Sequence, residues 1–500
     1  MYPIDYFWRS AERFPDNIAV ISSDGALTYR ELARQVLEEA ARLTALDAGE
    51  DAAVCIGAAN SVDHLIQILA VLAAGQIWVP LNPRNGDPEL RRIVEFVDPV
   101  AIFLDDAMAA RLSEVSPQPR ALGSKSGETA PPDRVKLGPA SPVGVPLDRT
   151  QAIKFTGGTT GTPKGVMQPL RAWNTNIITQ LAELKLTARD RYLVAAPLTH
   201  GTSTYMLPFL AAGGTLVFPA ESKPADLLDT AERHAVTVLF APPTLIFALM
   251  DEQQRQPRDL HALRYLVYGG APMRPEKIRK AQSLFGDVLC TSYGQTEAPQ
   301  IVTFLPPEMM TGEMMGSVGR ATAMTQMAIL SPDGRRLPVG EEGEIAVRGD
   351  LVMTGYFNAP EETAKVMTDG WLRTGDAGVM DEQGYLFMRD RLRDVIITGG
   401  FNVYPSDVEV VISRHPLVSD CSVVGIPDAK WGEAVHAAIE LRDAGTLDTD
   451  ALIASIKSEL GSVKAPKEIH IFDALPRSAV GKTVKSAVRS EILRRQGVSA

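Results

Sequence analysis

Short apolar runs alternate with amphipathic segments along the N-terminal part of this chain. The first runs are Ala53–Ile56, Ile77–Leu81 and Val100–Leu104. Runs of the same kind follow at Gln151–Phe155, Tyr192–Ala196, Thr215–Phe218, Val236–Phe240, Leu263–Tyr268 and Val288–Thr291. Runs this short and apolar are typical of parallel strands that are buried on both faces. Their alternation with helical segments predicts parallel sheets that are covered by helices.

The segments between the strands carry helix start and stop signals. Thr28 and Glu31 form the capping-box pattern at the start of one helix, and Ser61 is a candidate N-cap for the next helix. A further helix is predicted at Arg171–Leu184. The clearest pattern is Pro275–Phe285, which has proline at its first position and glycine just beyond its end.

Beyond about residue 315 the pattern changes to antiparallel strands with glycine-rich turns, at Glu344–Arg348 and Tyr385–Arg389. The last hundred or so residues predict a separate α+β unit. Its predicted elements are a helix capped by Ser406 and Glu409, strands Val418–Val424, Val435–Leu441 and Glu468–Phe472, and helix Asp448–Leu460. We therefore expect an α/β fold: a large N-terminal domain of stacked parallel-sheet subdomains, a β-rich subdomain, and a small C-terminal domain. Ser113–Leu147, rich in Pro, Gly, Ser and charge, is expected to be a surface connection.

Composition narrows the class of protein. The net charge of −11 argues against a nucleic-acid-binding protein. The three cysteines lie far apart without metal-ligand spacing, so we expect small core residues rather than a redox pair. The N-terminus lacks a signal-peptide pattern, and the most apolar stretch, Leu65–Ala74, is too short to span a bilayer. We expect a cytoplasmic enzyme with no transmembrane segment.

The stretch Thr156–Gly165 is the strongest candidate for chemistry. It reads Thr-Gly-Gly-Thr-Thr-Gly-Thr-Pro-Lys-Gly, so hydroxyl residues stand between glycines and Lys164 follows Pro163. Glycines let the backbone approach a ligand, and successive N–H groups form an anion site. A polyphosphate is the expected ligand. A structural turn is the alternative. A Walker loop is excluded because its lysine would be followed by Ser or Thr, whereas Gly165 stands here.

The loop resembles the phosphate loop of the adenylate-forming superfamily, which includes acyl-CoA synthetases, adenylation domains of peptide synthetases and firefly-type luciferases. Further motifs follow in the family's order over nearly the whole chain, so the chain is identified as a member, of the AMP-dependent acid–CoA ligase type. The resemblance implies an adenylation domain over residues 1–392, with its β-rich subdomain at about 315–392. It also implies a mobile C-terminal domain over 393–500, with its hinge near Arg393, where Asp or Lys is usual in the family.

The resemblance assigns the ATP site. It implies that the phosphates are held by Thr156, Gly157, Gly158, Thr159, Thr160, Gly161 and Lys164. The adenine would lie against Gly270, Ala271, Pro272, Tyr293 and Gly294. Thr296 would bind the α-phosphate and Glu297 a Mg²⁺ ion, a cation that prefers oxygen ligands. Asp376 and Arg391 would hold the ribose.

The resemblance also assigns the acid and thiol sites. His200 would stand beside the acyl carboxylate, and the acyl pocket would be lined by His200, Gly201, Thr204, Gly269 and Ala298. Gly399, Gly400 and Phe401 would reach the active site after a rotation of the C-terminal domain and pass the pantetheine arm of CoA. Lys482 would bridge the carboxylate and the α-phosphate during adenylation, where charge neutralisation carries most of the catalysis.

The expected reaction is the conversion of a carboxylic acid and ATP to acyl-AMP and pyrophosphate, followed by acyl transfer to CoA. One alternative acceptor is the phosphopantetheine thiol of a separate carrier protein. A non-catalytic nucleotide-binding protein is a second alternative, which the retention of every charged motif residue disfavours. Phe240–Thr244 contains no aspartate for an amino group, so we expect a monocarboxylic aromatic, alicyclic or medium-to-long acyl substrate. Both a monomer and a homodimer fit the sequence.

Overall fold

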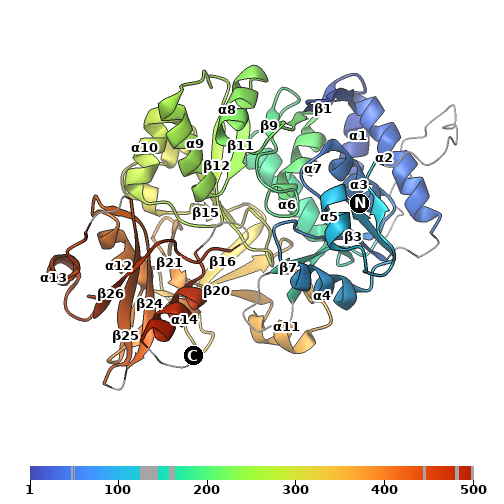
Figure 1. Cartoon of the computed structure of the whole chain (residues 1–500). Coiled ribbons are helices and arrows are strands. Elements are labelled where there is room, and N and C mark those ends of the chain that lie inside the picture. The colour runs from blue at the N-terminus through green and yellow to red at the C-terminus, as the bar shows by residue number, and fades with distance from the viewer. Residues whose placement is uncertain are drawn as a thin grey trace. The chain divides into compact units, whose positions relative to one another are not determined.

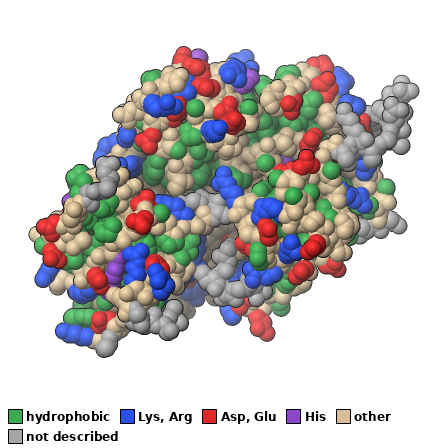
Figure 2. All heavy atoms as spheres, in the orientation of Figure 1, with side chains coloured by type: hydrophobic (Ala, Val, Ile, Leu, Met, Phe, Trp, Pro, Cys, Tyr) green, Lys and Arg blue, Asp and Glu red, His purple; other side chains and the backbone are tan. Residues whose placement is uncertain are grey.

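The computed structural model describes residues 1–46, 49, 51–123, 145–156, 164–428, 430–442, 446–478 and 483–496. The chain divides into two compact units (Figure 1). Unit 1 comprises Met1–Met327 and Val347–Arg373, and unit 2 comprises Ala328–Ala346 and Thr374–Ala500. On the face shown in Figure 2, Lys and Arg side chains are interspersed with Asp and Glu.

The larger sheet of unit 1 has nine strands in the order β15-β14-β13-β12-β11-β9-β10-β1-β2. The strands from β13 to β1 pair in parallel, and the strands at both edges pair antiparallel. Their bounds are β1 Ile18–Ser22, β2 Gly25–Thr28, β9 Arg191–Leu193, β10 Thr215–Val217, β11 Val238–Ala241, β12 Tyr265–Tyr268, β13 Leu289–Tyr293, β14 Thr303–Leu305 and β15 Arg320–Ala321. The predicted parallel sheet of buried apolar strands is confirmed.

The second sheet of unit 1 has the strand order β18-β8-β7-β4-β3-β5-β6. Its strands are β3 Ala53–Gly57, β4 Ile77–Pro80, β5 Ala101–Leu104, β6 Arg120–Ala121, β7 Thr150–Thr156, β8 Lys164–Pro169 and β18 Gly355–Tyr356. The pattern did not predict β8, because its six residues contain few apolar side chains. β8 returns antiparallel to β7, with Lys164 opposite Thr156. The predicted phosphate loop therefore joins the two strands of a hairpin.

Helices cover both sheets, as Figure 1 shows for α8, α9 and α10 beside β11 and β12. The helices of unit 1 are α1 Asp5–Arg13, α2 Tyr29–Thr44, α3 Val62–Ala73, α4 Asp87–Val97, α5 Asp106–Arg111, α6 Leu170–Glu183, α7 Ser203–Ala212, α8 Pro224–Arg233, α9 Pro243–Arg255, α10 Pro275–Phe285 and α11 Pro360–Val366. Short 3₁₀ turns span Pro307–Met309 and Gly312–Gly316. The capping box of Thr28 and Glu31 is present, and Ser61 accepts a hydrogen bond from the His64 N–H.

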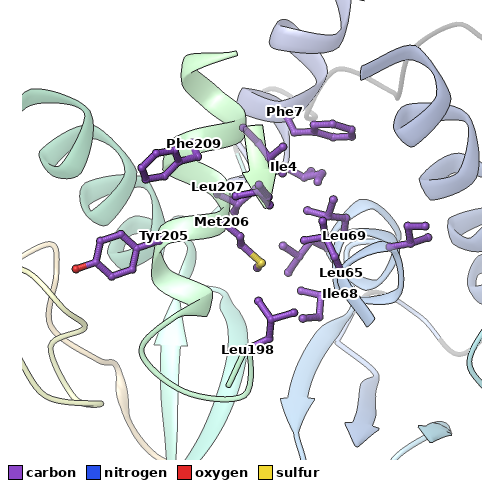
Figure 3. Close-up of a cluster of buried hydrophobic side chains, with 14 of the residues drawn as sticks. Ile4, Phe7, Leu65, Ile68, Leu69, Leu198, Tyr205, Met206, Leu207 and Phe209 are labelled. Carbon is purple, nitrogen blue, oxygen red and sulfur yellow. The ribbon is translucent and has the colours of Figure 1, made fainter. Parts of the chain in front are cut away.

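The main core of unit 1 lies where α1, α3 and α7 meet (Figure 3). Leu65, Leu69 and Met206 lie close together there, Phe7 lies above them, and all four are buried. Burying a side chain of this size contributes about 1.5–3 kcal/mol. α3 is the buried helix that the apolar stretch predicted. No helix in the described residues has both the length and the apolar character that a membrane crossing needs.

A five-stranded sheet contains chain from both units. It has the order β16-β17-β20-β19, with β21 beside β20. The strands are β16 Thr325–Leu330, β17 Gly343–Gly349, β19 Met367–Thr368, β20 Trp371–Met380 and β21 Leu386–Arg391. β20 pairs antiparallel with β19 and with β21, as expected for the β-rich region.

The remainder of unit 2 is a small α+β assembly. The 3₁₀ turn Leu392–Asp394 leads into strands β22 Ile396–Thr398, β23 Phe401–Val403, β24 Val418–Asp428, β25 Gly432–Leu441 and β26 Glu468–Phe472. The helices are α12 Pro405–Ile412, α13 Thr449–Leu460 and α14 Lys485–Arg495. β25 pairs antiparallel with β24 and parallel with β26. All three cysteines of the chain are free and buried, as expected.

The predicted cap at Ser406 is wrong. α12 begins at Pro405, and the N-cap position is Tyr404 without a side-chain cap. Proline suits the first helical position because its fixed φ is helical, so the helix starts two residues earlier than the serine pattern suggests. The Ser406 N–H is bound instead by Asp390 Oδ2 at 2.7 Å. Glu409 accepts the Val423 N–H at 2.8 Å and is therefore not part of a capping box.

Candidate active site

The hairpin of β7 and β8 presents Lys164 at the foot of the predicted phosphate loop. Gly157, Gly158, Thr159, Thr160 and Gly161 lie outside the described residues. Lys164 Nζ lies 2.8 Å from Glu362 Oε2 and 5.7 Å from the centre of the Tyr356 ring. Hydrogen bonds from Lys164 and Lys365 lower the pKa of Glu362 to about 2. A polyphosphate at this loop would compete with Glu362 for the three N–H donors of Lys164.

Tyr356 links this lysine to the predicted metal ligand. Its hydroxyl lies 2.9 Å from Glu297 Oε1, and the Met353 N–H donates to the Glu297 carbonyl at 2.8 Å. Burial, together with the adjacent Glu297 charge, raises the pKa of Tyr356, so the phenol stays protonated and donates. One carboxylate oxygen of Glu297 is thereby bound to Tyr356. The Tyr356 ring and hydroxyl thus join Lys164 and Glu297, which are far apart in sequence.

The predicted adenine and phosphate residues follow two neighbouring parallel strands. Gly269–Pro272 come directly after β12, and Gly294–Glu297 come directly after β13. Ligands bind at this carboxyl edge in open parallel sheets. Gly270 has φ +81°, a left-handed conformation that favours glycine. A Cβ on Gly294 would lie 2.7 Å from the backbone of Gln300, so no other residue fits there without a shift.

Two of the predicted acyl-pocket residues, Gly201 and Gly269, lie against the ring of Phe240. A Cβ on Gly201 would lie 3.0 Å from the Phe240 ring, and a Cβ on Gly269 would lie 3.2 Å from it. We expected the small residues to leave room for a substrate, but part of that room is filled by this ring. Thr204 and Ala298 are buried. His200 is half-buried, with Nδ1 3.0 Å from Thr199 Oγ1.

A polar bridge lies beside the same ring. Gln300 Nε2 donates to Tyr205 Oη at 2.8 Å and to Ser292 Oγ at 2.9 Å. Tyr205 in turn stacks on Phe240, with ring centroids 5.2 Å apart, and its hydroxyl points away from the apolar cluster (Figure 3). Aromatic faces and one amide therefore surround the two glycines.

Asp376 and Arg391 face each other in unit 2. They are directly paired residues of β20 and β21, and Arg391 Nε lies 3.5 Å from Asp376 Oδ1. Asp376 is buried whereas Arg391 is exposed. Gly375, at φ +70°, donates its N–H to Glu344 Oε1 at 2.9 Å and so fixes the turn. A carboxylate and a guanidinium on adjacent strands can bind the two hydroxyls of a ribose.

The predicted thiol-channel residues form the tip of the β22–β23 hairpin. Gly399 and Gly400 have φ of +58° and +83°, and Phe401 is 62% exposed. The Gly399 N–H binds the Trp431 carbonyl at 2.8 Å. The Nζ atoms of Lys430 and Lys467 lie 4.7 and 5.6 Å from the Trp431 ring centres. Arg393, the predicted hinge, is exposed in the turn before β22. Lys482 lies outside the described residues.

Comparison with known sequences decides the family. The sequence model described as AMP-binding enzyme matches residues 7–357, and the one described as AMP-binding enzyme C-terminal domain matches residues 407–482. The chain belongs to the AMP-binding enzyme family. It is 35% identical to a feruloyl-CoA synthase of an Amycolatopsis species, over 96% of this chain and 97% of the relative.

Two further similarities extend over the whole AMP-binding enzyme. A medium/long-chain fatty acid–CoA ligase of Mycobacterium tuberculosis is 33% identical over 96% of this chain and 88% of its own length. The solved structure of an amide bond synthetase from Marinactinospora thermotolerans superposes with a TM-score of 0.89 at 31% identity, covering 98% of this chain and 99% of that one. The predicted superfamily, the predicted fold class and the predicted ATP-dependent, AMP-forming acid–CoA ligase are confirmed.

The sequence of the AMP-binding enzyme did not predict that several further residues lie beside these motifs. Tyr356 and Glu362 show no local pattern, because each contacts the motifs from an element that is distant in sequence, β18 for Tyr356 and α11 for Glu362. Gln168 is similar: its Nε2 donates to the Thr296 carbonyl at 2.8 Å. Gln300 was expected as a pocket wall, directly after Ala298 and Pro299. Lys154 carried a signal that was available, namely a lysine within an apolar strand run.

Proposed function

We propose that this AMP-binding enzyme activates an aromatic monocarboxylic acid and transfers the acyl group to CoA. The observation that carries the choice of acid is the Phe240 ring, which lies against both Gly201 and Gly269. A planar acid can stack on such a face, whereas the ring fills space that a long flexible chain would need. The Gln300 amide beside it favours a ring with a polar substituent.

The proposed adenylation site uses the residues that the family motifs assign. Thr156, Lys164 and the loop amides hold the β- and γ-phosphates, and Thr296 binds the α-phosphate. Asp376 and Arg391 hold the ribose, and the adenine lies against Gly270, Ala271, Pro272, Tyr293 and Gly294. Positioning of the two anions and compensation of their charge supply the rate enhancement. Lys482 bridges the acid carboxylate and the α-phosphate, and His200 stands beside the carboxylate.

The residues present fit a Mg²⁺ ion bound with ATP. Glu297 is a carboxylate whose Oε1 is oriented by Tyr356, and hard oxygen ligands suit Mg²⁺. When bound, the ion would compensate phosphate charge. The chain's own part is to keep Glu297 in place: Tyr356 binds its carboxylate, and the Met353 N–H donates to its backbone carbonyl.

The proposed acceptor is the thiol of CoA. The exposed surface of Phe401, Trp431, Lys430 and Lys467 offers aromatic faces and positive charge, which suit the adenine and phosphates of CoA. A carrier-protein thiol or an amine, the latter suggested by the amide bond synthetase, are alternative acceptors.

Acid-dependent ATP–pyrophosphate exchange tests the proposal. We expect exchange with feruloyl-type or other aryl acids and little with fatty acids. Phe240→Ala should lose activity on the aryl acids and gain activity on medium-chain acids. The control Phe247→Ala, which deletes an aromatic ring within α9, should change neither activity. Preference of the wild type for fatty acids would refute the aromatic assignment. Offering the acyl-AMP to CoA, to a phosphopantetheinylated carrier and to an amine identifies the acceptor.

A further inference from the structure

Two histidines and one glutamate meet in unit 2, and none of them belongs to the sites above. His436 is in β25, and Glu468 and His470 are in the neighbouring strand β26. The strands pair in parallel with His436 opposite Glu468 and Ala438 opposite His470. The two histidines are 7% and 9% exposed, whereas Glu468 is exposed.

One ligand atom from each of these three residues faces the other two. His436 Nδ1 lies 3.0 Å from His470 Nε2, and Glu468 Oε2 lies 3.8 Å from the first nitrogen and 3.7 Å from the second. A triangle with these sides contains a point about 2.1 Å from all three corners, which is the length of Zn–N and Zn–O bonds. We propose that His436, Glu468 and His470 bind a Zn²⁺ ion.

The donor set selects the metal. Imidazole nitrogens suit Zn²⁺ and its neighbours, whereas Mg²⁺ and Ca²⁺ take oxygen ligands. Three protein ligands leave a fourth position for water, on the side of the exposed carboxylate. Gln496 Nε2 donates to Glu468 Oε2 at 3.1 Å and so orients this ligand from the next layer.

The imidazole rings have to turn when the ion binds. They lie end to end, with centroids 5.3 Å apart and planes 11° apart, so the facing nitrogens share one proton. The ion replaces that proton, and both rings rotate toward Glu468 so that their lone pairs converge on it. The ion would then cross-link β25 and β26. Because this cross-link joins two strands of unit 2, Zn²⁺ is expected to raise the melting temperature of the unit.

Competition with a chromophoric zinc chelator, on protein without a histidine tag, tests the site. We expect one Zn²⁺ per chain, with no competition from Mg²⁺. His470→Asn should abolish binding, and Glu468→Gln should weaken it by more than about tenfold. His261→Asn is the matched control, since that histidine is exposed in unit 1 and pairs only with Asp259 in the described residues. Its Zn²⁺ stoichiometry should equal that of the wild type.

Equal Zn²⁺ binding by the wild type and His470→Asn would overturn the proposal, as would a wild type that binds none. If His470→Asn does not fold, Glu468→Gln and a Co²⁺ titration of the wild type decide. Tetrahedral Co²⁺ absorbs visible light, and the absence of that absorption in the wild type would equally overturn the site. A Co²⁺ affinity of Glu468→Gln equal to that of the wild type would do the same.

Discussion

Lys154 is a buried cation in the strand that leads to the phosphate loop. Its Nζ donates to Ser203 Oγ at 2.7 Å and lies 4.9 and 5.5 Å from the rings of Trp78 and Trp173. No carboxylate in the described part of the chain forms an ion pair with it. Burial lowers the pKa of Lys154 to about 7, because the charged form loses its hydration. Ser203 Oγ donates onward to the His200 carbonyl at 2.6 Å, so the lysine braces the turn that carries His200.

This lysine predicts a pH-dependent stability of unit 1. Lys154 binds its proton up to about pH 10.5 in the unfolded chain but only up to about pH 7 in the folded chain. The free energy of unfolding therefore rises as the pH increases from 7 to 10.5, and it is lowest below pH 7. Lys154→Met should therefore be more stable than the wild type below pH 7, by on the order of 4 kcal/mol. The difference should vanish above pH 10.5. Denaturant unfolding followed by tryptophan fluorescence measures it.

Lys280→Met, which removes a partly exposed lysine of α10, is the control and should show no such trend. A Lys154→Met difference that stays constant across the pH range would mean that Lys154 keeps its ordinary pKa.

At the scale of elements, helix α14 is anchored within unit 2 by a half-buried charge cluster. Lys485 Nζ lies 2.8 Å from Glu409 Oε1 and 3.7 Å from Asp390 Oδ1. Burial raises the pKa of Asp390. Burial opposes the charge of Lys485 as well, but the carboxylates of Glu409 and Asp390 raise the pKa of this lysine nonetheless. The cluster lies next to the 3₁₀ turn of the predicted hinge, because Asp390 stands three residues before Arg393 in the sequence.

Lys485→Ala should lower the free energy of unfolding of unit 2 by about 2 kcal/mol, because two half-buried carboxylates lose their cation. Thermal or urea unfolding measures the change. Arg494→Ala, from an exposed pair with Glu491 on the same helix, should cost less than about 1 kcal/mol. Equal effects of the two substitutions would show that burial gives the Lys485 cluster no special weight.

Most elements of this fold were predictable because their signals are local. The apolar strands, the Thr28 capping box and helix Pro275–Phe285 depend on neighbouring residues only. The cap at Ser406 failed because a proline outcompeted a serine, and β8 was missed because strand pairing with β7 outweighs its weak pattern. Phe240 and Tyr356 act on the candidate site through contacts between distant segments, which no local pattern encodes. The roles of Gly157–Gly161 and Lys482 stay predictions from resemblance.

At the scale of the whole molecule, the expected division of labour separates two half-reactions. Lys482→Ala should abolish acyl-AMP formation, because the charge between carboxylate and α-phosphate is no longer compensated. It should leave thioester formation from supplied acyl-AMP unchanged, since the family resemblance implies a domain rotation that removes this lysine before that step. Quenched assays of each half-reaction measure this. Equal loss in both would refute the division.

The complementary substitution is Gly400→Val, at the tip of the β22–β23 hairpin. It should slow thioester formation at least about tenfold and spare adenylation, because a side chain there narrows the path of the pantetheine arm. Gly461→Val is the matched control: both glycines have φ +83° and no neighbour within 4 Å of an added Cβ. The control carries the same backbone strain outside the hairpin, so an equal slowing there would rule out a channel at Gly400.

The interleaving of the two units also sets an order for biosynthesis. Ala328–Ala346 belongs to unit 2, but Val347–Arg373, made next, belongs to unit 1. At roughly 5–20 residues per second the ribosome spends a few seconds on that intervening piece. Two contacts of Ile345 need residues that are made later. Its carbonyl accepts a hydrogen bond from Thr374 Oγ1, and its side chain packs over Gly378. Released chains that end between residues 346 and 374 therefore lack β20, and the edge of β17 that β20 would cover stays unpaired in them.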